Sequence, residues 1–269
     1  MLLNKFLATF TGRGDNQNPG APFFIIPMKN NICTLIVALV VAVAWPSMAV
    51  AQQRMSVDVE EVTVAQGQKV TVTKSIYLNP DGRMVVEQHR PDRTIYLTNR
   101  LGEMQIYTPR KNEVMVSNDR ELSSGRDMVA MFASGAYVDM DLPLFGYAQT
   151  SIRRDGDLTI KNFEPKSGGK KGVAKIELVF QNQLPICMVY YDGGGKALRK
   201  LYFSRYEYGL VALPMRVTEV EYTSPTDSLV RLSLYRNLRF GAEATSEMFD
   251  FEVPADAKRV VMPKPNVKK

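Results

Sequence analysis

The chain has 269 residues, of which 45% are hydrophobic and 23% are charged, and its formal net charge is +6. This composition is that of a globular protein with enough apolar material for a sizeable core. The basic excess is small and its charges are interspersed along the chain. A protein that binds nucleic acid through a strongly basic surface is therefore excluded.

The N-terminal region has the three parts of an export signal. Residues 28–51 contain Lys29 near their start, then an apolar run from about Ile32 to Trp45, then Ala49, Val50 and Ala51 at their end. A charged start, an apolar middle and small residues before the cleavage point are typical of a cleavable secretory signal. The mature protein is therefore expected in the periplasm.

The signal divides the chain into expected segments. Residues 1–27 would be an unfolded upstream extension, 28–51 the signal peptide, 52–262 one folded domain and 263–269 a disordered basic tail. A membrane anchor is the alternative to cleavage, because the apolar run approaches the roughly 20 residues that span a bilayer. Pro46 and the small residues after it favour cleavage.

The expected mature chain is nearly balanced in charge and has little cysteine. Removing the first 51 residues leaves 31 basic and 27 acidic residues, a net charge of +4. Cys187 is then the only cysteine, so an internal disulfide is excluded. The domain must be held together by its core and its strands.

Apolar and polar side chains alternate with a period of two in several stretches. These are residues 57–64, 69–78, 157–161, 174–181 and 230–235. Turn signals such as Asn-Pro-Asp-Gly at 79–82 and Asp-Gly-Gly-Gly at 192–195 separate such stretches at short intervals. The pattern predicts about eleven strands in a single antiparallel sheet with one face on a core and the other in water.

One segment in the middle of the chain has a helical pattern. Residues 123–135 are predicted to form a short helix, with a serine capping its start and Gly135 closing it. Met128, Met131 and Phe132 lie on one face of this helix. Because one short amphipathic helix cannot be a domain, we expect it to cover the concave face of a large, strongly bent sheet.

Methionine is abundant after the signal, with eleven residues. Its unbranched side chain adapts to irregular apolar shapes, which suits a flexible acyl chain, although ordinary core packing explains each methionine equally well. The apolar segment after the predicted helix is irregular and is expected to cross the sheet as a loop. The candidate lipid-binding residues are Met128, Met131, Phe132, Leu142 and Phe145.

No catalytic or metal-binding pattern is found. The chain has one histidine, His89, which we expect on the surface of a strand, and no G-x-S-x-G sequence. Residues 193–196, Gly-Gly-Gly-Lys, predict a hairpin turn because the remaining glycine spacing of a phosphate-binding loop is missing. Ligand clusters for zinc are missing as well. We therefore expect no enzyme, no metal and no cofactor.

Two acidic residues keep a hydrolase open as a further alternative. Glu219 and Glu221 share one face of a predicted strand, where they are expected to be solvated. Paired carboxylates also serve many glycoside hydrolases, so a hydrolase would require both to line a cleft.

The stretch around Arg90 and the end of the domain carry a resemblance. Arg90-Pro91 ends a strand, and an apolar strand at 94–98, Gly102 and the Ile-Tyr-Thr-Pro sequence at 106–109 follow. The sequence at 249–254 is Phe-Asp-Phe-Glu-Val-Pro. In this order the motifs resemble those of the periplasmic outer-membrane lipoprotein carrier family, the LolA-like proteins, over residues 70–261.

The resemblance implies an unclosed barrel of about eleven antiparallel strands, with helices as a lid over an apolar cavity. It further implies a monomeric carrier that takes acylated lipoproteins or lipids from an ATP-driven inner-membrane exporter toward the outer membrane. Arg90 would act as the latch that bonds the lid backbone. The chain departs from the family pattern, because strands are predicted at 57–64 and 69–78 where the family opens with a helix. A lipid-sensing or protein-interaction module on the same fold is the alternative.

Overall fold

The computed structural model describes residues 53–118, 123–166, 172–224 and 227–260. The chain clusters into two compact units, 1–49 and 50–269, and the described residues all belong to the second. The expected upstream extension, signal peptide and basic tail lie outside the described residues.

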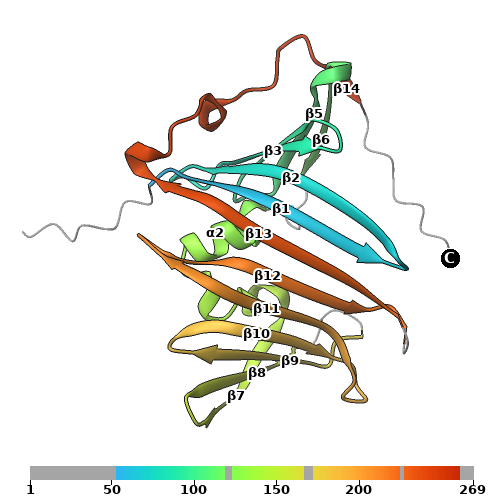
Figure 1. Cartoon of the computed structure of the whole chain (residues 1–269), viewed down its shortest axis with the longest axis vertical. Helices are drawn as coiled ribbons and strands as arrows, with labels where there is room; N and C mark the ends of the chain where they lie inside the picture. The colour runs from blue at the N-terminus through green and yellow to red at the C-terminus, as the bar shows by residue number, and fades with distance from the viewer. Residues whose placement is uncertain (1–52, 119–122, 167–171, 225–226, 261–269) are drawn as a thin grey trace, which may run out of the picture. The chain divides into compact units, whose positions relative to one another are not determined.

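Fourteen strands in the described part of the chain form one sheet (Figure 1). In chain order they are β1 Met55–Ala65, β2 Gln68–Leu78, β3 Met84–Arg90, β4 Thr94–Thr98, β5 Glu103–Thr108, β6 Glu113–Asn118, β7 Tyr147–Asp155, β8 Leu158–Pro165, β9 Lys175–Gln181, β10 Leu184–Tyr191, β11 Ala197–Tyr208, β12 Ala212–Tyr222, β13 Ser228–Phe240 and β14 Lys258–Val260. The order across the sheet is β14-β6-β5-β4-β3-β2-β1-β13-β12-β11-β10-β9-β8-β7.

The sheet confirms the predicted fold class and corrects the strand count. Neighbouring strands are antiparallel except for β14, which pairs in parallel with β6. The sheet curves without closing, because β14 and β7 remain at its two edges. The expected count of about eleven is too low, since strands of three to six residues, such as β14 and β4, offer few positions in which an alternation is visible.

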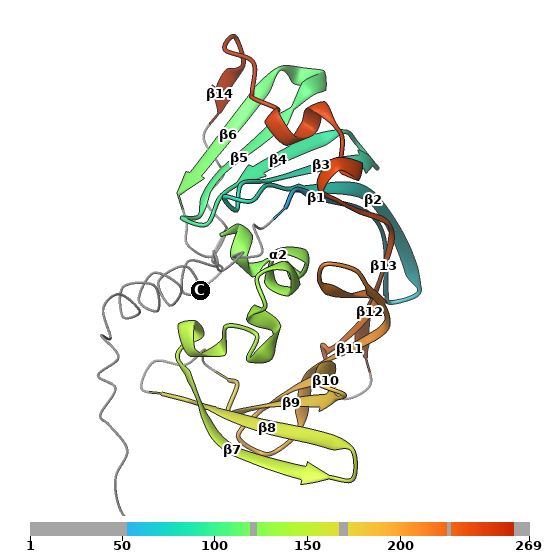
Figure 2. The same ribbon diagram turned by 90° about the vertical axis from the view of Figure 1, so that its left-hand side faces the viewer.

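A helical connection between β6 and β7 lies in the hollow of the sheet (Figure 2). It consists of 3₁₀ turns at Ser124–Arg126, Ala136–Val138 and Leu142–Phe145 and of helix α2, Met128–Ala133. We call residues 123–146 the lid. In the described part of the chain, three further 3₁₀ turns lie outside it, at Pro109–Lys111, Gly241–Glu243 and Glu247–Asp250. Among the described residues, the helices are all too short or too polar to cross a bilayer.

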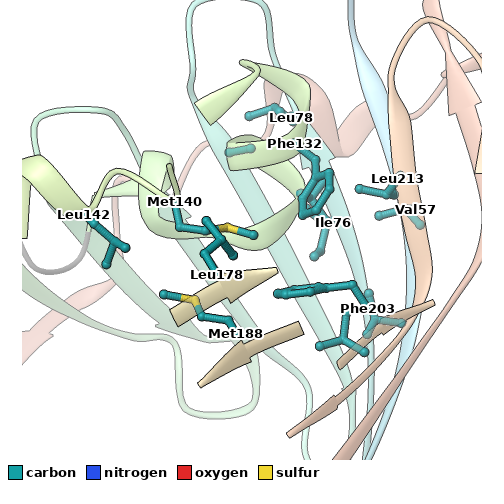
Figure 3. Packing of buried hydrophobic residues seen from close by; sticks show 14 of the residues in the cluster. Val57, Ile76, Leu78, Phe132, Met140, Leu142, Leu178, Met188, Phe203 and Leu213 are labelled. Carbon is teal, nitrogen blue, oxygen red and sulfur yellow. The ribbon is translucent and has the colours of Figure 1, made fainter. Parts of the chain in front are cut away.

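The main core fills the concave side of the sheet, beneath the lid (Figure 3). Inward-facing side chains of several strands meet three side chains of the lid there. They are Val57, Ile76, Leu78, Leu178, Met188, Phe203 and Leu213 from the sheet, and Phe132, Met140 and Leu142 from the lid. At one end of the long strands, the concave face is therefore apolar and packs against the lid.

A second core lies on the convex face of β3 to β6, where one side of the sheet was expected to face water. Val85 and Ile95 are completely buried there. The C-terminal segment, residues 241–257, covers this face with Phe249, Phe251 and other apolar side chains. The expectation of one solvated face is therefore wrong for this part of the sheet, where consecutive apolar residues serve both faces.

Candidate functional site

The lid helix is set by its capping residues. The side chain of Asp127 accepts a hydrogen bond from Val129 N at 2.8 Å and caps α2. Ser123 instead caps the preceding 3₁₀ turn through Gly125 N at 3.3 Å. The predicted helix over 123–135 is therefore shorter, because Asp127 takes an extended backbone that separates the turn from the helix.

Phe132 joins the lid to the sheet. Its side chain is 1% exposed and stacks on Tyr137, with ring centroids 5.0 Å apart. The rings of Phe203 and Tyr206 on β11 lie 6.1 Å from it. The space beneath α2, where the sequence predicted a cavity, is occupied at this point by an aromatic ring of the lid itself.

Few polar contacts tie the start of the lid to the sheet. Ser124 Oγ donates a hydrogen bond to Gly82 O at 2.6 Å, and Ser124 N donates to Asn99 O at 3.0 Å. Ser123 Oγ donates to Arg100 O at 2.9 Å. These acceptors belong to the turns after β2 and β4, so the lid is fastened to backbone carbonyls of two hairpins.

The later part of the lid is held by two cationic side chains. Lys161 Nζ on β8 donates to Val138 O at 2.7 Å, and its ammonium lies 4.6 Å from the centre of the Phe180 ring. The Arg126 guanidinium lies 4.2 Å from the centre of the Phe145 ring, within the lid. Such contacts contribute about 0.5–1 kcal/mol at exposed sites, so they position the lid without locking it.

A pocket of about 1000 Å³ opens between the lid and the two hairpin turns. Its walls include apolar side chains that are unusually open to solvent, since Leu144 is 81% exposed and Leu101 is 73% exposed. Phe145 and Ala130 of the lid also line it. The pocket is therefore an entrance beside α2 at which apolar side chains lie together with Arg100, Arg126, Asp139 and Asp141.

The concave face becomes charged beyond the lid. Five side chains from neighbouring strands alternate in sign, and we call them the charged row: Lys74 on β2, Glu61 on β1, Arg231 on β13, Glu219 on β12 and Arg199 on β11. Side chains two residues apart share a strand face. Glu61 thus shares the face of Val59, and Glu219 that of Val217, both of which belong to the concave core.

Pairing within the charged row is closest around Glu219. The two carboxylate oxygens of Glu219 lie 2.6 Å from Arg199 Nε and 2.9 Å from Arg231 Nη1. Glu61 lies 3.4 Å from Arg231 Nε and 3.5 Å from Lys74 Nζ. The row therefore stabilises Glu219, which is buried, more firmly than Glu61.

The lid brings a further carboxylate to this row. Burial raises the pKa of the Asp127 carboxyl above its usual range, and the nearby Lys74 ammonium offsets part of that rise. Burial also raises the pKa of Tyr235, with the carboxylates of Asp127 and Glu61 adding to the effect. Asp127, Lys74, Glu61 and Tyr235 thus form one polar cluster between the lid and the sheet.

The five apolar residues predicted for the lid all belong to the concave core. Phe132 and Leu142 are buried, whereas Met128, Met131 and Phe145 are half-buried and pack against the same core. Whether they contact a lipid stays a prediction.

Arg90 lies at the far end of β3 from the hairpin that holds the lid. It is exposed and pairs with Thr73 of β2, next to a register shift between β2 and β3. The shift places Arg90 with Thr73 on the convex face, opposite the face of Met84 and Val86, which belong to the concave core or pack against it. The lid backbone is bonded by Ser124 and Lys161, and the latch role of Arg90 stays a proposal.

Two other residues singled out in the sequence can be placed. His89 lies exposed on β3, as predicted, with Nε2 2.9 Å from Ser75 Oγ on the convex face. Glu221 is exposed as expected, but the expectation that Glu219 is solvated is wrong, because Glu219 is 7% exposed and paired with two guanidinium groups. Sequence reasoning missed the charged row, although Glu61 and Glu219 each sit two residues from an inward-facing valine.

Comparison with known proteins finds solved structures with a similar architecture. The chain matches no family model, and no curated protein matches it. Among solved structures, a DUF1329 family protein from Desulfovibrio piger aligns with a TM-score of 0.51 and 16% identity, covering 80% of this chain and 96% of that one. A putative outer membrane lipoprotein-sorting protein domain from Vibrio parahaemolyticus aligns with a TM-score of 0.50 and 12% identity, covering 74% and 90%.

A LolA superfamily protein from Nitrosomonas europaea is also similar, with a TM-score of 0.46, 12% identity, and coverage of 70% and 86%. The fold is LolA-like. The resemblance found in the sequence is confirmed for the architecture. The predicted departure is confirmed as well, because the domain opens with the strands β1 and β2.

Proposed function

We propose that the protein is a periplasmic carrier that binds the acyl chains of lipoproteins or lipids on the concave side of its sheet. The observation that carries this proposal is the lid, whose apolar side chains occupy an apolar hollow that the sheet leaves open on one side. The present arrangement would be the empty, closed state, in which Phe132 takes the place of an acyl chain. The LolA-like fold supports the same function.

Energy magnitudes are compatible with reversible binding. Burial of an acyl chain stabilises a complex by about 0.8 kcal/mol per methylene group. Displacing the lid uncovers Phe132 and its neighbours, which offsets part of that gain and permits release. The cargo would come from an ATP-driven inner-membrane exporter and pass toward the outer membrane.

The proposal is tested by native mass spectrometry of the protein co-expressed with an acylated lipoprotein. We expect a bound lipid or lipoprotein, and a faster uptake of a fluorescent acyl probe by Ser124→Ala. This variant loses the hydrogen bond to Gly82 O, which is worth about 1 kcal/mol. Ser204→Ala is the control, because Ser204 is exposed on the face of β11 opposite Phe203, and its hydroxyl lies near Arg216 O on β12.

A second candidate function is a sensor or protein-interaction module on the same fold. The packed position of Phe132 favours it, since a module that acts through its surface needs no ligand space. Protein that carries no lipid after co-expression, with equal probe uptake by wild type and Ser124→Ala, would support this function and contradict the carrier.

A further inference from the structure

The concave face changes from apolar to charged along the same strands. On β1, Val57 and Val59 lie in the core beneath the lid, and Glu61 follows two residues later on the same face. On β12, Val217 and Glu219 repeat this order. A molecule bound along the strands would therefore meet apolar side chains at one end and charged side chains at the other.

Solvent reaches part of the cationic side chains of the charged row. The row contains three cations and two carboxylates, and the exposed Glu221, the register partner of Arg199, adds a third carboxylate on the same face. The side chains of Arg199 and Arg231 are 40% and 36% exposed and that of Lys74 is 27% exposed, although the Nε atom of each arginine is buried. The distances of 3.4 and 3.5 Å around Glu61 are long for hydrogen bonds.

Arg90 at the end of β3 does not extend the row. The register shift makes Arg90 the partner of Thr73, which lies on the opposite face of β2 from Lys74. The cations of the row therefore come from β11, β13 and β2. Cationic side chains of this kind hold phosphate and carboxylate oxygens through charge-assisted hydrogen bonds.

The lid supplies a carboxylate to the charged row in the closed state. Asp127 begins α2 and faces Lys74 and Tyr235. Because Asp127 belongs to the lid, any movement that withdraws Phe132 from the apolar hollow also withdraws this carboxylate from Lys74. One movement thus uncovers an apolar surface and the adjoining charged row together.

We propose that the ligand of this site is an acyl amphiphile with an anionic head, which the charged row binds in place of the Asp127 carboxylate while the chains take the place of Phe132. This inference rests on the proposed acyl-binding function and specifies its ligand class. A neutral acyl lipid would fill the apolar half alone.

The test compares two ligands with the same chains, dihexanoylphosphatidylglycerol and dihexanoylglycerol, by isothermal titration calorimetry on the full chain. We expect the wild type to bind the anionic ligand about tenfold more tightly, with a preference that shrinks as salt increases. Arg199→Gln is expected to remove most of this preference and to leave binding of dihexanoylglycerol unchanged. Arg216→Gln is the matched control, because Arg216 lies on the opposite face of β12 from Glu219.

The outcomes separate this inference from the proposed function. Equal affinity for both ligands, unchanged in Arg199→Gln, overturns the anionic head while acyl binding stands. Failure of both ligands to bind overturns acyl binding and the head group together. Tight binding of inorganic phosphate alone, competing with neither ligand, also overturns the inference, because the anion site is then separate from the chain site. Lys74→Gln repeats the test if Arg199→Gln does not fold.

Discussion

The two apolar faces of this sheet are covered in different ways. The convex face of β3 to β6 is covered by the C-terminal segment, which is fastened along its length. Arg83 donates hydrogen bonds to the carbonyl oxygens of Phe249 and Phe251, Asn79 Nδ2 donates to Phe249 O at 2.7 Å, and Arg54 pairs with Asp250 at 2.7 Å. The segment then continues into β14, which pairs with β6.

The lid on the concave face has no such continuous fastening among its described contacts. Its polar contacts to the sheet include hydrogen bonds of Ser123 and Ser124 at its start, of Lys161 with Val138 O near its middle and of Lys166 N with Gly146 O at its end. It also carries Asp127, whose burial opposes its charge. The difference indicates that the C-terminal segment is a permanent cover and the lid a removable one.

The largest expected effect comes from truncating the central aromatic residue of each cover. Phe249 and Phe132 are 0% and 1% exposed, so Phe249→Ala and Phe132→Ala should each lower the free energy of unfolding by about 3–5 kcal/mol in urea titrations. Only Phe132→Ala should increase the binding of an acyl probe, because it leaves an apolar cavity at the proposed site. Greater probe binding by Phe249→Ala would contradict the view that the C-terminal segment is a permanent cover and the lid a removable one.

An intermediate effect is expected for Arg83→Met. This variant leaves the carbonyl oxygens of Phe249 and Phe251 without their charged donor and should lower stability by roughly 2–3 kcal/mol. Hydrogen exchange followed by mass spectrometry should show faster exchange in residues 241–260 and unchanged exchange in α2. Equal acceleration in both covers would mean that they open together.

The smallest effect is expected for Asp127→Asn, which keeps a good helix cap and removes the charge. Because burial raises the pKa of the Asp127 carboxyl, the folded protein binds this proton more tightly than the unfolded chain does. The resulting contribution to the free energy of unfolding is therefore complete at low pH and is lost as pH rises through the raised pKa. The groups that face it are Lys74, Tyr235 and Glu61, the last paired with Arg231.

The amide introduced by Asp127→Asn does not ionise, so the melting temperature of this variant should exceed that of the wild type near neutral pH by roughly 2–4 °C, which corresponds to about 1 kcal/mol. The gain should disappear toward acidic pH, and uptake of an acyl probe should slow. A variant that melts lower than the wild type at neutral pH would show that the attraction of Lys74 outweighs burial.

The sheet could be predicted from the sequence wherever one face is apolar and the other polar. Residues 174–181 alternate regularly, and β9 spans Lys175–Gln181. The same rule failed at Val85 and Ile95, because strands covered on both faces lose the alternation. The helix prediction placed Met128, Met131 and Phe132 correctly toward the core, but Ser123 was taken as the cap that Asp127 provides.

The candidate site could be predicted only in its apolar half. That half comes largely from one continuous segment, in which the spacing of Met128, Met131 and Phe132 is visible. The charged row is assembled from two groups of strands, β1 with β2 and β11 with β12 and β13. The groups lie far apart in the chain and meet only because β1 pairs with β13. Strand order and register decide that its members meet, and neither is visible in the alternation of a single strand.

An unclosed sheet also has two edges at which a foreign strand could pair, which is a route to aggregation. The edge of β6 is taken by β14 of the same chain, and β14 has only three residues to offer as a template. The other edge, β7, has a register shift between Gln149 and Ser151 and ends in the charged residues Arg153, Arg154 and Asp155. Irregular and charged edges discourage such pairing. The sheet can therefore stay unclosed, with room for a lid, without promoting aggregation through its edges.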